Sequence, residues 1–205
     1  MSKNFVQELL SWVEVIVVAV VLAFFLVTFI IVNATVPSGS MENTIMPGDR
    51  LLGLRLTYYF SSPKRGDIAV FHYPVDDELL GKKTNYIKRV IGLPGETVEI
   101  RNAKIYINGS DEPLDEPYLK EEWTVANNVS QKYEIPENCY LMLGDNRNNS
   151  SDARYWPYEA VKTAAENGLT ITAEEAWNLS FVRKDQFVGK AYLRYWPLTK
   201  IGVLH

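Results

Sequence analysis

VIVVAVVLAFFLVTFIIV runs from Val15 to Val32 and decides how the whole chain is organised. The run contains no charged residue, and Thr28 is its only polar member. At about 1.5 Å per residue it forms a helix of roughly 27 Å, close to the ~30 Å hydrocarbon core of a bilayer. We therefore predict one transmembrane helix over residues 15–33, preceded by a short segment 1–14 and followed by a larger domain 34–205.

The main alternative for this run is a cleaved secretory signal. Such a signal usually has an apolar core of roughly 7–15 residues behind a basic stretch. Here the preceding MSKNFVQELLSWVE contains one lysine and two glutamates, so length and flank favour an uncleaved anchor. Charge counting would place the N-terminus outside, because Lys3 alone precedes the run and several basic residues follow it. Long domains translocate largely regardless of charge, so orientation stays open on these grounds.

Charge and residue content exclude several classes of function. The net charge is −4 with no basic stripe, which argues against a nucleic-acid partner. Cys139 is the only cysteine, so an internal disulfide framework is excluded, and we expect it to be a small buried residue opening an apolar strand. His72 and His205 are the only histidines, too few for a zinc site, and we expect neither a metal nor a cofactor.

Beyond residue 33 the sequence changes to short apolar runs separated by turns. Runs rich in β-branched and aromatic residues predict strands at 67–73, 86–91, 97–100 and 104–107. Leu93-Pro-Gly95 and Asn108-Gly109 predict tight turns between them. The sequence therefore predicts a mainly β domain built on an antiparallel sheet.

Two stretches interrupt this pattern. Residues 110–137 are polar and acidic and carry proline, which predicts a surface excursion with little regular structure and no part in chemistry. Residues 158–181 predict a short helical insertion of two helices. Pro157 and Gly168 would bound the first helix, and a capping box at Thr172–Glu175 would open the second. We expect this insertion to be peripheral.

Three polar features could carry chemistry. Ser40 follows the apolar run by eight residues, so it works within about 26 Å of the bilayer even on an extended linker. Lys88 lies among apolar neighbours that lower the pKa of an amine, whereas the neighbouring Arg89 stays protonated and cannot be a base. A dense polar loop, Gly144–Arg154, follows an apolar strand. Each feature alone also has an ordinary interpretation. Ser40 could be a linker serine, Lys88 could extend its ammonium to solvent from an edge strand, and the polar loop could be an exposed turn.

The features occur within ordered sequence blocks. The chain contains Pro37-Ser-Gly-Ser-Met41, Arg65-Gly-Asp-Ile-Ala-Val-Phe71, Lys88-Arg-Val-Ile-Gly-Leu-Pro-Gly95 and Gly144-Asp-Asn-Arg-Asn-Asn-Ser-Ser-Asp-Ala-Arg154. Val188-Gly-Lys-Ala191 and Arg194-Tyr-Trp-Pro197 follow near the end. In this order the blocks resemble those of type I signal peptidases, over roughly residues 33–202. Their joint occurrence outweighs the ordinary interpretation of each one.

The resemblance implies a β catalytic core of the signal-peptidase type and a serine endopeptidase mechanism. Ser40 would be the nucleophile and neutral Lys88 the general base, with an acyl-enzyme intermediate. The Ser38 hydroxyl and the Ser40 backbone N–H would form the oxyanion hole. Ser150 would orient the lysine. The loop residues expected to support the site are Asp145, Asn146, Arg147, Asp152 and Arg154, with the last two as an ion pair.

The resemblance also implies location and substrate. The protein would be a single-pass protein of the cell membrane, with residues 1–14 cytoplasmic and 34–205 on the extracytoplasmic side. Its partners would be the lipid bilayer and the signal peptides of exported preproteins, cut after small residues in Ala-x-Ala-like sites. One departure lies after the nucleophile, where Asn43 replaces the proline of many members, and we expect a less rigid loop there.

Two other functions compete with this one. A self-cleaving regulator with a Ser-Lys pair would carry a DNA-binding segment where this chain has its apolar run. A non-enzymatic, membrane-tethered β module would bind another protein and would tolerate Ser40→Ala and Lys88→Ala. The membrane run argues against the first, and the ordered blocks favour an enzyme over the second.

Overall fold

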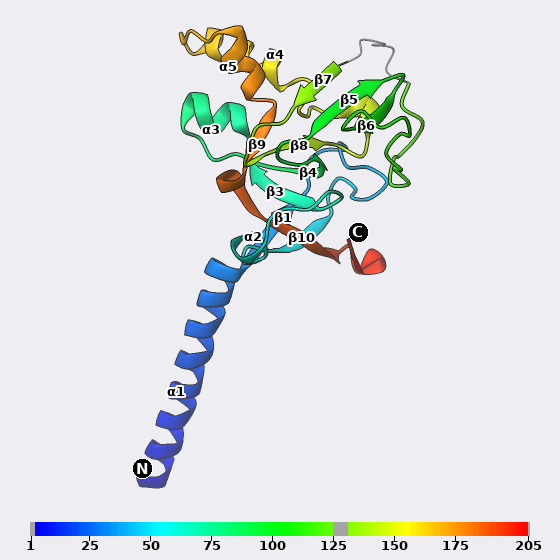
Figure 1. The fold of residues 1–205 in the computed structure, drawn as a ribbon. Helices are drawn as coiled ribbons and strands as arrows, with labels where there is room; N and C mark the ends of the chain where they lie inside the picture. Colours follow the sequence, from blue (N-terminus) through cyan, green and yellow to red (C-terminus); the bar gives the residue numbers. More distant parts are fainter. Residues whose placement is uncertain (1–2, 125–130, 205) are drawn as a thin grey trace.

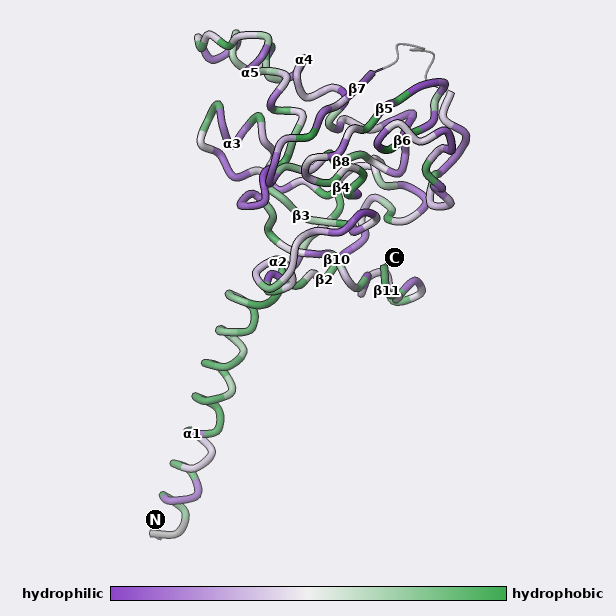
Figure 2. Tube along the Cα trace, viewed as in Figure 1, coloured by the Kyte–Doolittle hydropathy of each residue, from purple (hydrophilic) through white to green (hydrophobic). Residues whose placement is uncertain are grey.

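The computed structural model describes residues 3–124 and 131–204, and its first element is one long helix. α1 spans Lys3–Phe25 and continues into a π-helical turn, η1, at Leu26–Ile30. The helix projects away from the rest of the chain (Figure 1), and most of its length is hydrophobic (Figure 2). Phe5–Ile30 is long and apolar enough to cross a membrane. The predicted apolar helix is confirmed; it begins earlier than residue 15, and Ile31 already belongs to the first strand.

A large antiparallel sheet forms the body of the domain. Its strands follow the order β1-β2-β10-β3-β4-β8-β9, and β11 pairs with β10. The strands are β1 (Ile31–Thr35), β2 (Arg50–Leu54), β3 (Ile68–His72), β4 (Asn85–Gly92), β8 (Cys139–Leu143), β9 (Phe181–Arg183), β10 (Phe187–Trp196) and β11 (Gly202–Val203). Neighbouring strands of this sheet pair antiparallel throughout the described residues, which confirms the predicted fold class.

A smaller antiparallel sheet lies at the end of the domain away from α1 (Figure 1). It has the order β6-β5-β7, with β5 at Thr97–Arg101, β6 at Lys104–Ile107 and β7 at Gln131–Glu134. Gly95 adopts a positive φ of 76° in the turn before β5, as expected for a glycine that follows proline. The predicted strands at 97–100 and 104–107 and their turns are therefore confirmed, whereas β7 lies within residues 110–137, where the sequence predicted little regular structure.

Short helices connect and cover the sheets. They are α2 (Thr57–Phe60), α3 (Pro74–Leu80), α4 (Trp156–Glu166) and α5 (Ala173–Asn178), with 3-10 turns η2 (Arg147–Asn149), η3 (Lys184–Gln186) and η4 (Leu198–Lys200). The predicted pair of helices in the insertion is confirmed. Thr172 accepts a hydrogen bond from the Glu175 backbone and Glu175 bonds back, so the capping box is also present.

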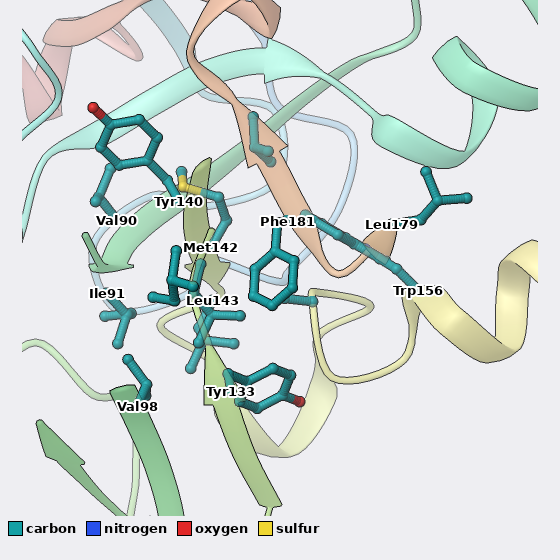
Figure 3. Close-up of a cluster of buried hydrophobic side chains, with 14 of the residues drawn as sticks. Val90, Ile91, Val98, Tyr133, Tyr140, Met142, Leu143, Trp156, Leu179 and Phe181 are labelled. Atoms are coloured by element: carbon teal, nitrogen blue, oxygen red, sulfur yellow. The ribbon is translucent and has the colours of Figure 1, made fainter. Parts of the chain in front are cut away.

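The main core lies between the central strands and the insertion (Figure 3). Met142 and Leu143 of β8 are fully buried, as is Trp156 at the start of α4. Ala160 of α4 and Ala176 of α5 belong to the same cluster. The prediction that the insertion is peripheral was therefore wrong, because its small and aromatic side chains complete the core.

Cys139 opens β8 as predicted but is only half-buried. Burial still raises the pKa of its thiol, which keeps it protonated and unreactive near neutral pH.

Candidate active site

Ser40 lies in the loop that joins β1 to β2, and apolar side chains hold this loop in place. Met41 and Ile45 are fully buried, in a cluster that includes residues of β2, β3 and β10. At the base of the loop the Val36 N–H donates to the Asp49 carbonyl at 3.0 Å. Ser40 itself is 7% exposed, so its side chain is largely buried while it lines the neighbouring cleft.

Lys88 lies in β4 and reaches Ser40 across the sheet. Its backbone pairs with Ala69 of β3. The residue is buried, with 4% of its surface exposed. Nζ lies 2.8 Å from Ser40 Oγ and donates to the Ile87 carbonyl at 3.2 Å. A 2.8 Å contact is short enough for a proton to move between the hydroxyl and the amine. The structure thus brings together two residues that lie 48 positions apart.

The environment of Lys88 favours its neutral form. Burial lowers the pKa of the ammonium from 10.5 to about 8, although the negative charges of Asp152, Glu159 and Asp145 partly oppose this. A substantial fraction of the amine is therefore neutral at mildly alkaline pH, as a general base requires.

Arg89 points to the other side of the strand, where it meets Asp145. Its Nε and Nη2 donate to the two carboxylate oxygens at 2.8 and 2.7 Å. The pair is buried, and Thr44 Oγ1 donates to the same carboxylate at 2.6 Å. The guanidinium also lies 3.9 Å from the ring centre of Tyr118. Strand alternation thus separates the candidate base from a structural ion pair that ties β4 to the polar loop.

The polar loop is organised around Asp152. Its carboxylate binds Arg154 at 2.7 and 2.8 Å and accepts the Gly144 N–H at 3.0 Å, so the predicted ion pair is present. Burial would raise the pKa of Asp152, but the Arg154 charge and these hydrogen bonds hold it below its usual value. A Cβ on Gly144 would lie 2.5 Å from the Ser40 carbonyl oxygen, so only glycine permits this close approach.

Asn146 binds the backbone of the serine loop. Its N–H donates to the Ser40 carbonyl at 3.0 Å, and its side-chain amide donates to the Gly39 carbonyl at 3.0 Å. The loop after β8 therefore binds the backbone at the candidate nucleophile through two hydrogen bonds from one residue.

Arg147 connects the polar loop to the acidic excursion. Its guanidinium binds both carboxylate oxygens of Glu116, at 3.0 and 2.5 Å, and its Nε donates to the Gly144 carbonyl. Trp123 lies over Arg147 and Arg154, with ring-centre distances of 5.4 and 5.0 Å. The excursion is thus part of the site's support, a role that the sequence did not reveal, because nothing distinguishes Glu116 from its acidic neighbours.

Ser38 and Ser150 also lie at the site. The Ser38 hydroxyl donates to Ser40 Oγ at 3.4 Å. Ser150 Oγ is buried and points toward the Asp152 carboxylate, whose pKa it helps to lower, although it makes no hydrogen bond of good geometry within the described residues. An added Cβ on Gly144 would meet both Ser150 Oγ and the Ser40 carbonyl, so these two groups lie on the same face of Gly144.

Asn43 adopts a left-handed backbone conformation, with φ of 88°. Proline cannot take this angle, because its ring fixes φ near −65°. The Asn43 side chain donates to the carbonyls of Tyr118 and Leu119 at 3.1 and 3.3 Å. The residue therefore ties the serine loop to the excursion, rather than only loosening it.

A cleft of about 610 Å³ opens beside the Ser40 and Lys88 side chains. Residues 33–40 of β1 and its loop line one wall, and residues 84–88 in and before β4 line another, together with Val70, Asn149 and Ser151. β1 is the edge strand of the large sheet. An edge strand beside a cleft can pair with an extended peptide through its free backbone groups.

A family model described as "Signal peptidase, peptidase S26" matches residues 9–196. The chain belongs to the S26 signal peptidase family. The family predicted from the ordered blocks is therefore confirmed, as is the prediction that the protein is an enzyme of the serine endopeptidase class.

Relatives match over most of the chain. It is 34% identical to a probable signal peptidase I-2 of Synechocystis, over 95% of this chain and 78% of that protein. It is 33% identical to a signal peptidase I P of Bacillus subtilis subsp. natto, over 98% and 96% respectively. A crystal structure of a signal peptidase I from Enterococcus faecalis is 30% identical and covers 63% of this chain and 97% of that one, with a TM-score of 0.42.

Proposed function

We propose that this peptidase is a membrane-anchored enzyme that removes signal peptides from exported preproteins, with Ser40 as nucleophile and Lys88 as general base. The observation that carries the proposal is the 2.8 Å contact between Lys88 Nζ and Ser40 Oγ, with the lysine buried. Family membership supplies the reaction, and this contact supplies the means of activating a serine without a histidine.

The reaction proceeds in two halves. Neutral Lys88 takes the Ser40 proton as Oγ attacks the scissile carbonyl carbon, and the resulting ammonium then protonates the leaving amine as the peptide C–N bond breaks. The product of this half is an ester on Ser40. In the second half Lys88 removes a proton from water, the hydroxide attacks the ester carbonyl, and the proton returns to Ser40 as the acid product leaves.

In the tetrahedral intermediate the former carbonyl oxygen of the substrate carries a negative charge, which hydrogen-bond donors must stabilise. We assign this role to the Ser38 hydroxyl and the Ser40 backbone N–H. The hydroxyl supports the assignment because it lies 3.4 Å from Ser40 Oγ in the same loop and lines the cleft. Loss of one such donor typically costs on the order of a hundredfold in rate.

Ser150 is proposed to orient Lys88. Its hydroxyl is buried, lies over Gly144 close to the Ser40 carbonyl, and points toward the Asp152 carboxylate, whose pKa it helps to lower. A hydroxyl that donates toward the Asp152 carboxylate keeps its oxygen lone pairs free to accept a hydrogen bond from the Lys88 amine. The supporting residues Asp145, Asn146, Arg147, Asp152 and Arg154 are proposed to hold this arrangement rather than to react.

The substrate is proposed to bind as an extended strand beside β1 and to place small residues next to Ser40. The edge position of β1 and the cleft along residues 33–40 support the extended mode. The preference for Ala-x-Ala-like sites comes from the family resemblance alone.

The enzyme is proposed to cross the cell membrane once, with residues 1–14 in the cytoplasm and residues 34–205 outside. Ser40 lies ten residues after Ile30, the last residue of the candidate span, so the reaction takes place near the bilayer surface. A signal peptide held in the same membrane would present its cleavage site at this height.

The test is cleavage of a purified preprotein by the detergent-solubilised full chain. We expect Ser40→Ala and Lys88→Ala to lower kcat/KM by at least about a thousandfold, since neither attack nor proton transfer remains. Lys132→Ala, which removes an exposed strand lysine, is the matched control and should leave kcat/KM unchanged. Full activity of Lys88→Ala would refute the Ser-Lys mechanism, and unaltered biological function of both variants would favour a binding module.

A further inference from the structure

The helical insertion reaches the candidate active site through the first turn of α4. There the Glu159 carboxylate accepts hydrogen bonds from two different parts of the domain. Tyr73, which follows β3, donates its hydroxyl to Oε2, and Ser151 of the polar loop donates to Oε1 at 2.7 Å. One carboxylate therefore links the insertion, the central sheet and the residue next to Ser150.

An aromatic stack continues from Tyr73 to the lysine. The rings of Tyr73 and Tyr86 are parallel, with centroids 4.3 Å apart, and Trp156 packs edge-on against both at 5.6 and 6.5 Å. Lys88 Nζ lies 5.3 Å from the centre of the Tyr86 ring. The Tyr86 ring therefore lies between the glutamate-bound tyrosine and the amine, and it also lines the cleft.

Glu159 differs from the other carboxylates that act on Lys88. Three carboxylates of the polar loop and α4 raise the pKa of Lys88 through their negative charge: Asp152, Glu159 and Asp145. Asp145 is neutralised by Arg89, and Asp152 by Arg154. Within residues 3–124 and 131–204 no ion pair to Glu159 is found, and its carboxylate accepts hydrogen bonds from two hydroxyls. Its negative charge is therefore the one that acts on the lysine without a cation beside it.

We propose that Glu159 is a positioning residue for the Ser40 and Lys88 pair, and that the helical insertion carries it to the site. The carboxylate fixes the Tyr73 and Tyr86 rings against which the amine rests, and through Ser151 it fixes the loop segment that carries Ser150. Its charge also favours the ammonium that forms when Lys88 accepts the serine proton. This inference rests on the proposed function, because it assumes that Lys88 is the base.

The experiment measures kcat/KM against pH for the full-length chain in detergent, with a preprotein substrate. In Glu159→Gln the amide keeps the size of the side chain but loses its charge. Because a nearby negative charge raises the pKa of an amine, its loss should move the acid limb of the profile to lower pH by roughly half a unit. Glu166→Gln at the exposed end of α4 is the matched control and should leave the limb in place.

Tyr73→Phe separates position from charge. It removes the hydroxyl that binds Glu159 but leaves the stack and the carboxylate, so kcat should fall roughly 3- to 10-fold with the acid limb unmoved. It also provides an independent test if Glu159→Gln fails to fold, which circular dichroism would show. The inference would be overturned if the kcat/KM profiles of Glu159→Gln and Tyr73→Phe both coincided with that of the wild type. If Lys88→Ala kept full activity, the proposed function would fail instead, so the two failures are distinguishable.

Discussion

Lys88 and Arg89 are neighbours in β4, yet their side chains meet opposite partners. The amine contacts Ser40 at 2.8 Å, whereas the guanidinium binds Asp145 through two hydrogen bonds. Because adjacent residues of a strand point to opposite faces, the two side chains meet different partners. The chemistry of the two groups explains why one is proposed as a base and the other forms an ion pair. A buried guanidinium stays protonated and needs a carboxylate, while a buried amine can lose its proton.

The pH dependence of cleavage follows from this burial. Because the pKa of Lys88 is lowered to about 8 and only the neutral amine is a base, kcat/KM should rise tenfold per unit below pH 8 and level off above it. Initial rates from pH 6 to pH 10, with substrate well below KM, would measure the limb. A profile that is flat across this range would contradict a lysine base.

The same burial should make Lys88 a cost to stability. Between pH 8 and pH 10.5 the unfolded lysine binds more protons than the folded one, so stability rises with pH across this window. Below pH 8 the folded lysine is protonated, and its burial lowers the free energy of unfolding by the full amount of about 3 kcal/mol. We therefore expect Lys88→Met to be more stable than wild type at pH 7 by about 1–3 kcal/mol.

Thermal unfolding in detergent at pH 7 and pH 10.5 would test this cost. The difference in Tm between Lys88→Met and wild type should shrink as pH rises. Lys132→Met, at an exposed strand position, should show no such trend. An equal Tm difference at both pH values would show that the folded lysine is not desolvated.

At the scale of elements, the loop after β8 works as a clamp with buried ion pairs. Asp145 and Asp152 are both fully buried, and each has an arginine partner. Removal of one member of a buried pair leaves its partner charge in a medium that solvates it poorly. The clamp should therefore be stiff and intolerant of single substitutions.

Asp145→Asn tests the clamp. It keeps the shape of the side chain but leaves the Arg89 charge without its carboxylate. We therefore expect the free energy of unfolding to fall by about 3–5 kcal/mol. The measurement is the midpoint of denaturant unfolding followed by circular dichroism. Glu134→Gln, in an exposed pair with Lys132, is the control and should leave the midpoint in place. A midpoint equal to wild type in Asp145→Asn would mean that the pair is not buried in solution.

At the scale of the whole molecule, local patterns predicted the elements but not all of their contacts. The strands and the capping box follow from short motifs with their own physical logic, whereas the pairing of Ser40 with Lys88 was predicted only from the resemblance of the ordered blocks to a known family. Glu116, Thr44 and Glu159 could not be selected, because each is an ordinary residue until the fold sets it beside an arginine, an aspartate or a tyrosine. The insertion was misjudged for the same reason, since small residues in a helix do not reveal what they pack against.

The anchor and the catalytic domain are joined by little more than the chain itself. The side chains of α1 are exposed from Phe5 to Phe25, and β1 begins directly after η1 (Figure 1). The helix therefore contributes almost nothing to the packing of the domain. Under the proposed function, its value is that it holds the enzyme and a membrane-bound substrate at the same surface. Such tethering replaces a three-dimensional search with a local one.

A chain that lacks residues 1–25 should therefore fold and keep its chemistry but lose its advantage on membranes. We expect kcat/KM on a short soluble peptide to stay within about threefold of the full chain, because Ser40, Lys88 and the cleft are all retained. On a preprotein inserted in the same vesicles as the full-length enzyme, the truncated chain should be slower by about 10²-fold or more, the usual gain from effective concentration. Both rates are measured in parallel, with Ser40→Ala in each background as the zero. Equal loss on both substrates would mean that α1 supports the catalytic domain itself, and no loss on either would mean that the substrate does not meet the enzyme at the membrane.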